Sequence, residues 1–443
     1  MPRRAYLLFS LLLTVPAWSQ VEPEAEGGPT PVEDTQMMTP PPVSGVPYPH
    51  TATLQGSPNY LSAGVSANGG YVNNILQSSN TPPVNDGVFS VYPTFMLARS
   101  TPHQQATITY SPSFVFYQPT SVLDTVNQGA SLTYQDRLSP HVTFNAEDSF
   151  YRTSDVFDQS YFFSDGGVTG SSQNPSTTVI APFAQQLSNS GQAFLSYQFA
   201  RNGMIGAGGS YQTADFSAPG ASTGLANSNQ AGAWAFYNRR LTQSQYFGFV
   251  YQYARTLAQQ GSQQSDTQLH SLLPFYTFYF AHAFSVSISG GAQRVGLTLP
   301  NLPAAASWLP ALVASLGWQR DRGYLAGNYS HTVTSGQGLF GAFKMNSIGL
   351  SGGWRLGRTW DAGMSISYSS TSDAVPQLVS YAGGSSIAGQ ASLSHTIHES
   401  FSAAFGYQRL HQQYSGIAII SADPDSNRVY AGITYSFLKP LGK

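Results

Sequence analysis

Two short motifs in the chain match the sequence patterns of known catalytic or metal-binding sites. Residues 220–224 (Gly-Ala-Ser-Thr-Gly) fit the pattern of a nucleophile elbow, but that motif needs a strand–turn–helix to expose its serine. Here a Gly/Ser-rich segment surrounds the serine, so chance explains the match. Residues 423–427 alternate oxygen-bearing side chains but lack the glycine and distal glutamate of a calcium loop, and they indicate a hairpin turn. The sequence therefore predicts no catalytic residues and no enzyme.

Histidine and cysteine give no support for a metal site or a cofactor. The nine histidines show no H-E-x-x-H or comparable ligand spacing. Cysteine is absent, which excludes both a disulfide framework and a thiolate metal site. We expect no cofactor and no bound metal.

Two sets of charged residues remain as candidates for binding. Asp155, Asp158 and Asp165 lie in one long segment, residues 153–190, together with the aromatic run 161–163. The second set consists of arginines that each follow the apolar face of a predicted strand, and they are Arg152, Arg255, Arg294 and Arg409. A guanidinium is suited to phosphate by its planar donor fork, so this set predicts a rim that binds lipopolysaccharide phosphates. The alternative is a generic solvated rim.

The composition indicates the class of protein in which these residues occur. The chain has 443 residues, of which only 9% are charged, far below the roughly 25% usual in soluble domains. After residue 20 no apolar run reaches the 18 or so residues that a spanning helix needs. Aromatic residues make up 13% of the chain, which argues against general disorder. An all-β chain remains.

The first 58 residues differ from the rest. Arg3 and Arg4 precede an apolar stretch, residues 5–15, and small residues follow at 17–19, so we predict a signal peptide over residues 1–19; a retained membrane anchor is the alternative. Residues 20–58 are rich in proline and acidic side chains, without lysine or arginine, and are predicted to be disordered. They would serve as a periplasmic tether, as a segment that enters a lumen, or as a leader without a role. The slightly acidic balance predicts no nucleic-acid partner.

From residue 59 to residue 437 the chain alternates with period two. Ala362, Met364 and Ile366, for example, alternate with glycine and serine, which gives each strand one apolar and one polar face. We count about eighteen such strands. Short connections fall near residues 100, 140, 202, 242, 282, 321, 358 and 399, and they alternate with long ones over residues 72–86, 118–126, 153–190, 217–229, 256–266, 296–306, 334–342, 370–385 and 411–426. Such alternation is typical of transmembrane barrels with short periplasmic turns and long extracellular loops.

The last strand carries the most specific signal. Gly432, Tyr435 and Phe437 match a glycine followed by two aromatics spaced two apart, and this resembles the last-strand signal of bacterial outer-membrane β-barrel proteins. Six further residues, 438–443, depart from the pattern as a short C-terminal extension. The resemblance implies recognition by the barrel assembly machinery, contact with outer-membrane lipids and lipopolysaccharide, and an outer-membrane location.

This resemblance is porin-like and extends over nearly all of residues 59–437. It implies an antiparallel transmembrane β-barrel that carries ions and other hydrophilic solutes through a water-filled channel. In general porins the third long loop folds inward, which implies a constriction here whose carboxylates (Asp155, Asp158, Asp165) attract cations; the alternative is an external flap. An export barrel for an exopolysaccharide and a plugged structural or adhesive barrel also remain open, and the oligomeric state is undetermined.

Overall fold

The computed structural model describes most of the chain after residue 58. The described ranges are 59–75, 84–155, 157, 184–217, 225–280, 283–300, 302–320, 322–336, 338–375, 383–414 and 425–440. All of them belong to one compact unit. The predicted signal peptide (1–19) and the Pro-rich segment (20–58) lie outside these ranges.

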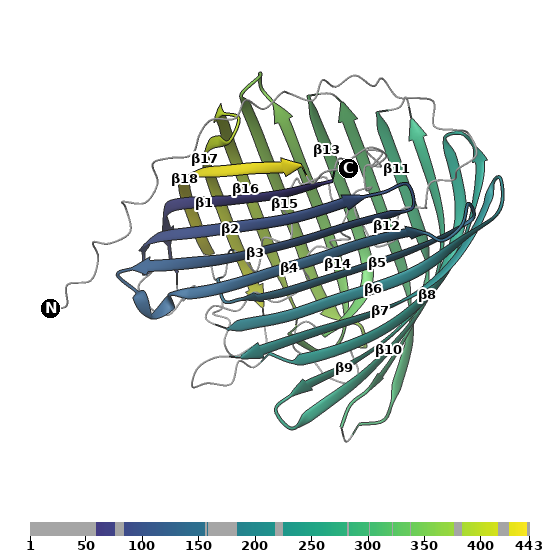
Figure 1. Cartoon of the computed structure of the whole chain (residues 1–443). Helices are drawn as coiled ribbons and strands as arrows, with labels where there is room; N and C mark the ends of the chain where they lie inside the picture. Colours follow the sequence, from purple (N-terminus) through teal and green to yellow (C-terminus); the bar gives the residue numbers. More distant parts are fainter. Residues whose placement is uncertain are drawn as a thin grey trace. The chain divides into compact units, whose positions relative to one another are not determined.

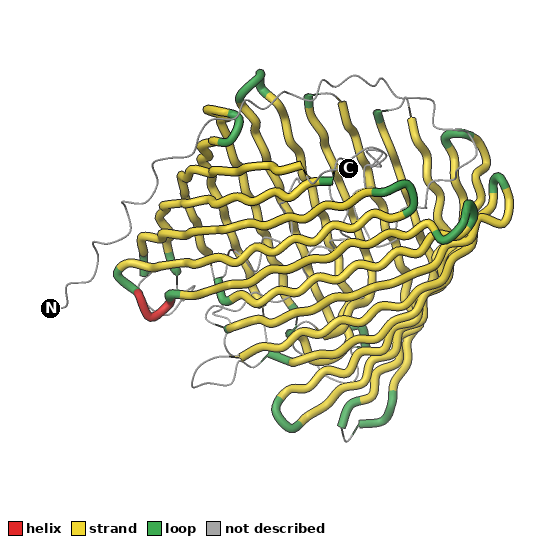
Figure 2. Tube along the Cα trace, in the orientation of Figure 1, coloured by secondary structure: helices red, strands yellow, loops and turns green. Residues whose placement is uncertain are grey.

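Eighteen long strands make up this unit, with one short 3₁₀ turn, η1, at Ser121–Leu123 (Figure 1, Figure 2). Each strand has between 12 and 18 residues, enough to cross a bilayer at a tilt. The strands are β1 (Tyr60–Asn73), β2 (Asp86–Ser100), β3 (Gln104–Gln118), β4 (Thr125–Arg137), β5 (Val142–Thr153), β6 (Gln185–Ala200), β7 (Gly203–Ser217), β8 (Asn227–Thr242), β9 (Gln245–Gln260), β10 (Gln263–Phe280), β11 (Phe284–Thr298), β12 (Ala305–Arg320), β13 (Gly323–Gly336), β14 (Leu339–Arg355), β15 (Trp360–Asp373), β16 (Gly384–His398), β17 (Phe401–Tyr414) and β18 (Asp425–Pro440).

Pairing of the first strand with the last closes the sheet into a barrel. Each strand is antiparallel to the one before and the one after it in the chain, and β1 pairs with both β2 and β18. The β1–β18 register runs from Tyr60 opposite Pro440 to Asn73 opposite Asn427. Closure leaves no sheet edge with unpaired backbone groups. The predicted all-antiparallel barrel of eighteen strands is confirmed.

The strand connections follow the predicted alternation with two exceptions. At one end of the barrel all eight connections have two to four residues. At the other end most are longer, but β9–β10 and β13–β14 are joined by two residues each. The predicted long loops over residues 256–266 and 334–342 are therefore wrong. Both segments are polar or Gly-rich, but their backbone continues the strand ladder, as the pairing of Arg255 with Gln268 and of Thr334 with Phe343 shows.

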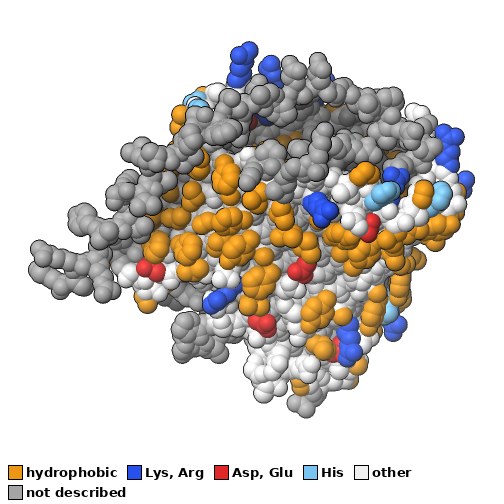
Figure 3. Space-filling model, viewed as in Figure 1, with side chains coloured by type: hydrophobic (Ala, Val, Ile, Leu, Met, Phe, Trp, Pro, Cys, Tyr) orange, Lys and Arg blue, Asp and Glu red, His pale blue; other side chains and the backbone are white. Residues whose placement is uncertain are grey.

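The alternating sequence places apolar side chains on the outward face. On β18, Val429, Ile433 and Phe437 point outward and are 40%, 51% and 43% exposed. Just before them on the same strand, Ser426 and Arg428 are buried on the inward face. Figure 3 shows hydrophobic side chains spread over the outward surface of the near strands, with few charged groups among them. An outward apolar surface of this extent requires lipid around it.

Within the described ranges, no helix has the length and apolar character needed to cross a membrane.

Labelling of intact cells tests the orientation of the barrel. Short turns face the periplasm in bacterial barrels, so a tag inserted at Ser222, in the β7–β8 connection, should be reachable from outside. A tag inserted at Pro140, in the β4–β5 turn, should become reachable only after the outer membrane is permeabilised. Labelling of Pro140 in intact cells would reverse the orientation.

Closure by β18 gives a second prediction, on assembly. Phe437→Ala should lower the yield of heat-modifiable folded barrel more than removal of residues 438–443 does, because the removed segment contributes only three register pairs, Leu438–Pro440 with Tyr60–Ser62. Folded yield is measured by band shift on unheated gels. An unchanged yield for Phe437→Ala would place the assembly signal elsewhere.

Candidate functional site

The inward face of the barrel is the surface on which a site can be built, and its chemistry is mainly that of hydroxyl and amide groups. Many of these groups bond to one another across strands. Ser330 Oγ lies 2.7 Å from Ser347 Oγ, Thr277 Oγ1 lies 3.0 Å from Ser287 Oγ, and Gln293 Nε2 donates to Ser271 Oγ at 3.0 Å. Hydroxyl and amide groups can form hydrogen bonds with water and with neutral polar solutes.

Part of this face is covered by a hairpin that leaves the barrel wall. Pairing of β13 with β12 ends at His331 opposite Leu312, although β12 itself continues to Ala305. The chain over residues 332–342, which we call the inward hairpin, turns into the lumen. There the Val333 amide donates to Gln293 Oε1 on β11 at 3.0 Å, and Ser335 Oγ donates to Thr256 Oγ1 on β9 at 2.7 Å. The hairpin therefore crosses in front of β11, β10 and β9.

Glycines make this path possible. Gly336 and Gly338 flank the hairpin tip with backbone φ angles of 79° and 93°, which residues with a Cβ rarely adopt. A Cβ on Gly336 would also lie 2.7 Å from Ser228 Oγ. Beyond them, the Ala226 amide donates to the Gly338 carbonyl at 3.1 Å, which joins the tip to the segment before β8.

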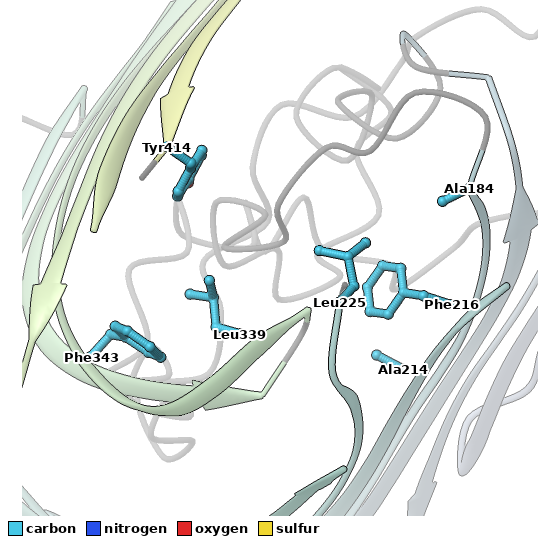
Figure 4. Packing of buried hydrophobic residues seen from close by; sticks show 7 residues of the cluster. All are labelled: Ala184, Ala214, Phe216, Leu225, Leu339, Phe343 and Tyr414. Atoms are coloured by element: carbon cyan, nitrogen blue, oxygen red, sulfur yellow. The ribbon is translucent and has the colours of Figure 1, made fainter. Parts of the chain in front are cut away.

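An apolar cluster fixes the hairpin tip against both sides of the barrel. Leu339 of the hairpin is 1% exposed and belongs to one cluster with Leu225 and with Phe216 of β7, which lie beside each other (Figure 4). Phe343 of β14 and Tyr414 of β17 belong to the same cluster. The contacts link strands that are far apart around the barrel, so they narrow the lumen at the long-loop end.

A second group narrows the lumen on another side, and it contains one of the predicted site residues. Asp155, two residues after β5, is 2% exposed and accepts from the Tyr117 hydroxyl at 3.0 Å. Arg428 of β18 lies 3.7 Å from the same carboxylate oxygen, and its guanidinium lies 5.8 Å from the centre of the Phe157 ring. The β5–β6 connection therefore begins inside the barrel. The Asp155 carboxylate in this connection is paired with the Arg428 guanidinium.

The other two predicted constriction residues, Asp158 and Asp165, lie outside the described residues. The role of Asp155, Asp158 and Asp165 in ion selection remains a prediction. Sequence reasoning missed Arg428, because nothing in the linear sequence shows that β18 comes close to the end of β5.

The four arginines of the predicted lipid-phosphate rim all face outward in the half of the barrel near the long connections. Two of them have acidic partners: Arg255 lies 2.7 Å from Asp266, and Arg409 lies 3.0 Å from Asp425. Arg152 donates to Gln185 at 3.3 Å. Phosphate binding by the rim remains a prediction.

Arg294 has different neighbours. It lies between His270 of β10 and Trp308 of β12 in the register, and Trp308 is 69% exposed. No hydrogen bond or ion pair joins Arg294 to another described residue. It is thus the arginine of this set whose side chain is best placed to meet a lipid headgroup.

The predicted assembly residues lie on the closing strand. Tyr435 and Phe437 point outward near the short-turn end, and Tyr435 packs on Phe401 with ring centres 5.7 Å apart. Gly432 faces inward, and a Cβ there would overlap the Asn68 side chain of β1. Recognition of these residues by the assembly machinery remains a prediction.

No arrangement of three or more His, Asp or Glu side chains among the described residues could hold a metal ion.

Comparisons with known proteins find distant similarity. No protein-family model and no curated protein matches the chain. Similar solved structures include the FrpB iron transporter from Neisseria meningitidis (F3-3 variant), with 10% identity, a TM-score of 0.42, and coverage of 87% of this chain and 83% of that one. Others are OccAB4 from Acinetobacter baumannii (9%, TM-score 0.39, 86% and 99%) and OpdL from Pseudomonas aeruginosa (10%, TM-score 0.37, 85% and 99%). At these scores the likeness carries no argument about function.

The class of the protein follows from its own structure. A closed antiparallel barrel with an apolar outward face and a polar inward face is a transmembrane β-barrel of the bacterial outer membrane.

Disruption of the buried ion pair tests the geometry inside the mouth. Arg428→Gln or Asp155→Asn leaves a buried charge without its partner, so each should lower the free energy of unfolding by about 3 kcal/mol. Urea unfolding in phospholipid vesicles, followed by tryptophan fluorescence, measures the change.

The exposed pair Arg409–Asp425 is the matched control. Both of its side chains are about half exposed (54% and 43%), so Arg409→Gln should cost less than about 1 kcal/mol. Equal losses for Arg428→Gln and Arg409→Gln would contradict the buried placement of Arg428.

Proposed function

We propose that this protein is an outer-membrane channel for hydrophilic solutes, narrowed from inside at its extracellular mouth. The observation that carries the proposal is the polar inward face of a closed barrel of eighteen strands. Wall side chains cannot fill a barrel of this size, because sixteen- and eighteen-stranded barrels leave an aqueous channel unless another element blocks it.

The elements seen inside the barrel favour a narrowed channel over a structural plug. The inward hairpin and the segment at Asp155 both lie at the long-loop end. Toward the short-turn end, inward side chains such as Ser62, Ser66 and Thr434 are only half-buried.

A second candidate, passage of a saccharide chain, is favoured by aromatic side chains on the inward face. Phe194 and Trp234 lie with ring centres 6.1 Å apart on either side of β7. The Trp234 ring lies close to Gly208, where a Cβ would be 2.7 Å from ring atom Cζ2, and the two rings are inclined at 53°. Aromatic rings on a polar wall offer apolar faces to sugar rings.

Conductance of the purified protein in planar bilayers tests the proposed function. Wild type should form steps of ion current. A variant in which residues 335–342 are replaced by Asn-Gly should show a larger single-channel conductance, because Thr334 pairs with Phe343 and every residue removed belongs to the inward hairpin. Absence of current in wild type and in this variant would contradict the channel.

The same recordings separate the two candidates. Oligosaccharide should interrupt the current of a saccharide channel, and Trp234→Ala should weaken that block. Current that oligosaccharide leaves unaffected would argue for small solutes alone.

A further inference from the structure

The distribution of ionisable side chains between the two faces singles out one carboxylate. Most charged residues of the described strands point outward or lie at a strand end. Among the described residues, Glu147 is the one Asp, Glu, His, Lys or Arg side chain that faces the lumen more than three residues from the end of its strand. It lies near the middle of β5, and both of its register partners, Thr133 on β4 and Gln192 on β6, are uncharged.

The surroundings of Glu147 leave its charge uncompensated. Gln192 Nε2 donates to Glu147 Oε2 at 2.7 Å, which orients the carboxylate without neutralising it. No ion pair joins Glu147 to a described cation. Asp155, in contrast, is paired with Arg428 and is 2% exposed, whereas Glu147 is only half-buried.

We propose that Glu147 is the residue that gives this channel a preference for small cations over anions, an inference that rests on the channel function proposed above. A fixed carboxylate on the wall of a lumen attracts cations and repels anions, as carboxylates do in cation channels. The neutral hydroxyl and amide lining around it supplies no competing charge at this depth.

The next residue in the chain provides a matched control. Asp148 carries the same charge on the opposite face of β5, where it is exposed and accepts from Asn189 Nδ2 at 3.2 Å. The effect of a carboxylate that faces the lumen can thus be compared with that of one that faces outward at the same depth in the barrel.

Reversal potentials under a potassium chloride gradient measure the effect. Glu147→Gln should lower the ratio of cation to anion permeability about threefold at 0.1 M salt, where the screening length is about 10 Å, and less at 1 M. Asp148→Asn should leave the ratio unchanged. Equal ratios for wild type and Glu147→Gln in a conducting channel would overturn the inference while the channel function stands, whereas absence of current would remove the channel function itself.

A cysteine variant keeps the test open if Glu147→Gln folds poorly. The chain contains no cysteine, so Glu147→Cys introduces a single thiol. An anionic thiol reagent should restore the cation preference of this variant and a cationic reagent should reverse it, while Asp148→Cys responds to neither. Failure of both reagents to shift the reversal potential of a labelled Glu147→Cys channel would also overturn the inference.

Discussion

The need to satisfy every backbone hydrogen bond inside a lipid bilayer governs this structure. Hydrocarbon offers no partner for a free amide or carbonyl, so a sheet can cross it only when its first and last strands meet. Pairing of β1 with β18 along their whole length supplies that closure. Once the sheet is closed, alternate residues of each strand face the lipid, and the residues between them face the lumen. Every inference about the lumen depends on this assignment.

Narrowing of the lumen comes from places where the chain leaves the wall. The inward hairpin departs at His331 and replaces the lost wall pairing with side-chain bonds to Gln293 and Thr256. The segment at Asp155 is held by Arg428. The described residues of both departures form hydrogen bonds or an ion pair within the barrel, as most buried polar groups do. Among the described residues, the Asp155 carboxylate at the mouth is paired with Arg428, whereas Glu147, farther down the lumen, is half-buried and forms no ion pair with a described cation.

The strands could be predicted from the sequence because their faces alternate, and the number of strands follows from that pattern. The connections were harder. Residues 256–266 are polar on both faces because they lie beyond the apolar band, and polarity alone does not distinguish a loop from a strand. The inward hairpin has a signal in its three closely spaced glycines, Gly336, Gly338 and Gly341, but their φ values appear only in the structure. The partnership of Asp155 with Arg428 depends on closure, which no local pattern contains.

The most direct test of the narrowed mouth is whether the inward hairpin touches β9. Ser335→Cys with Thr256→Cys puts two thiols where the hydroxyl oxygens are 2.7 Å apart, in a chain without other cysteines. In outer-membrane vesicles treated with a mild oxidant, mass spectrometry should find these two residues joined by a disulfide. The control pair Ser335→Cys with Leu257→Cys, in which the second thiol is on the outward face, should stay reduced. Free thiols in both pairs after oxidation would contradict the placement of the hairpin inside the barrel.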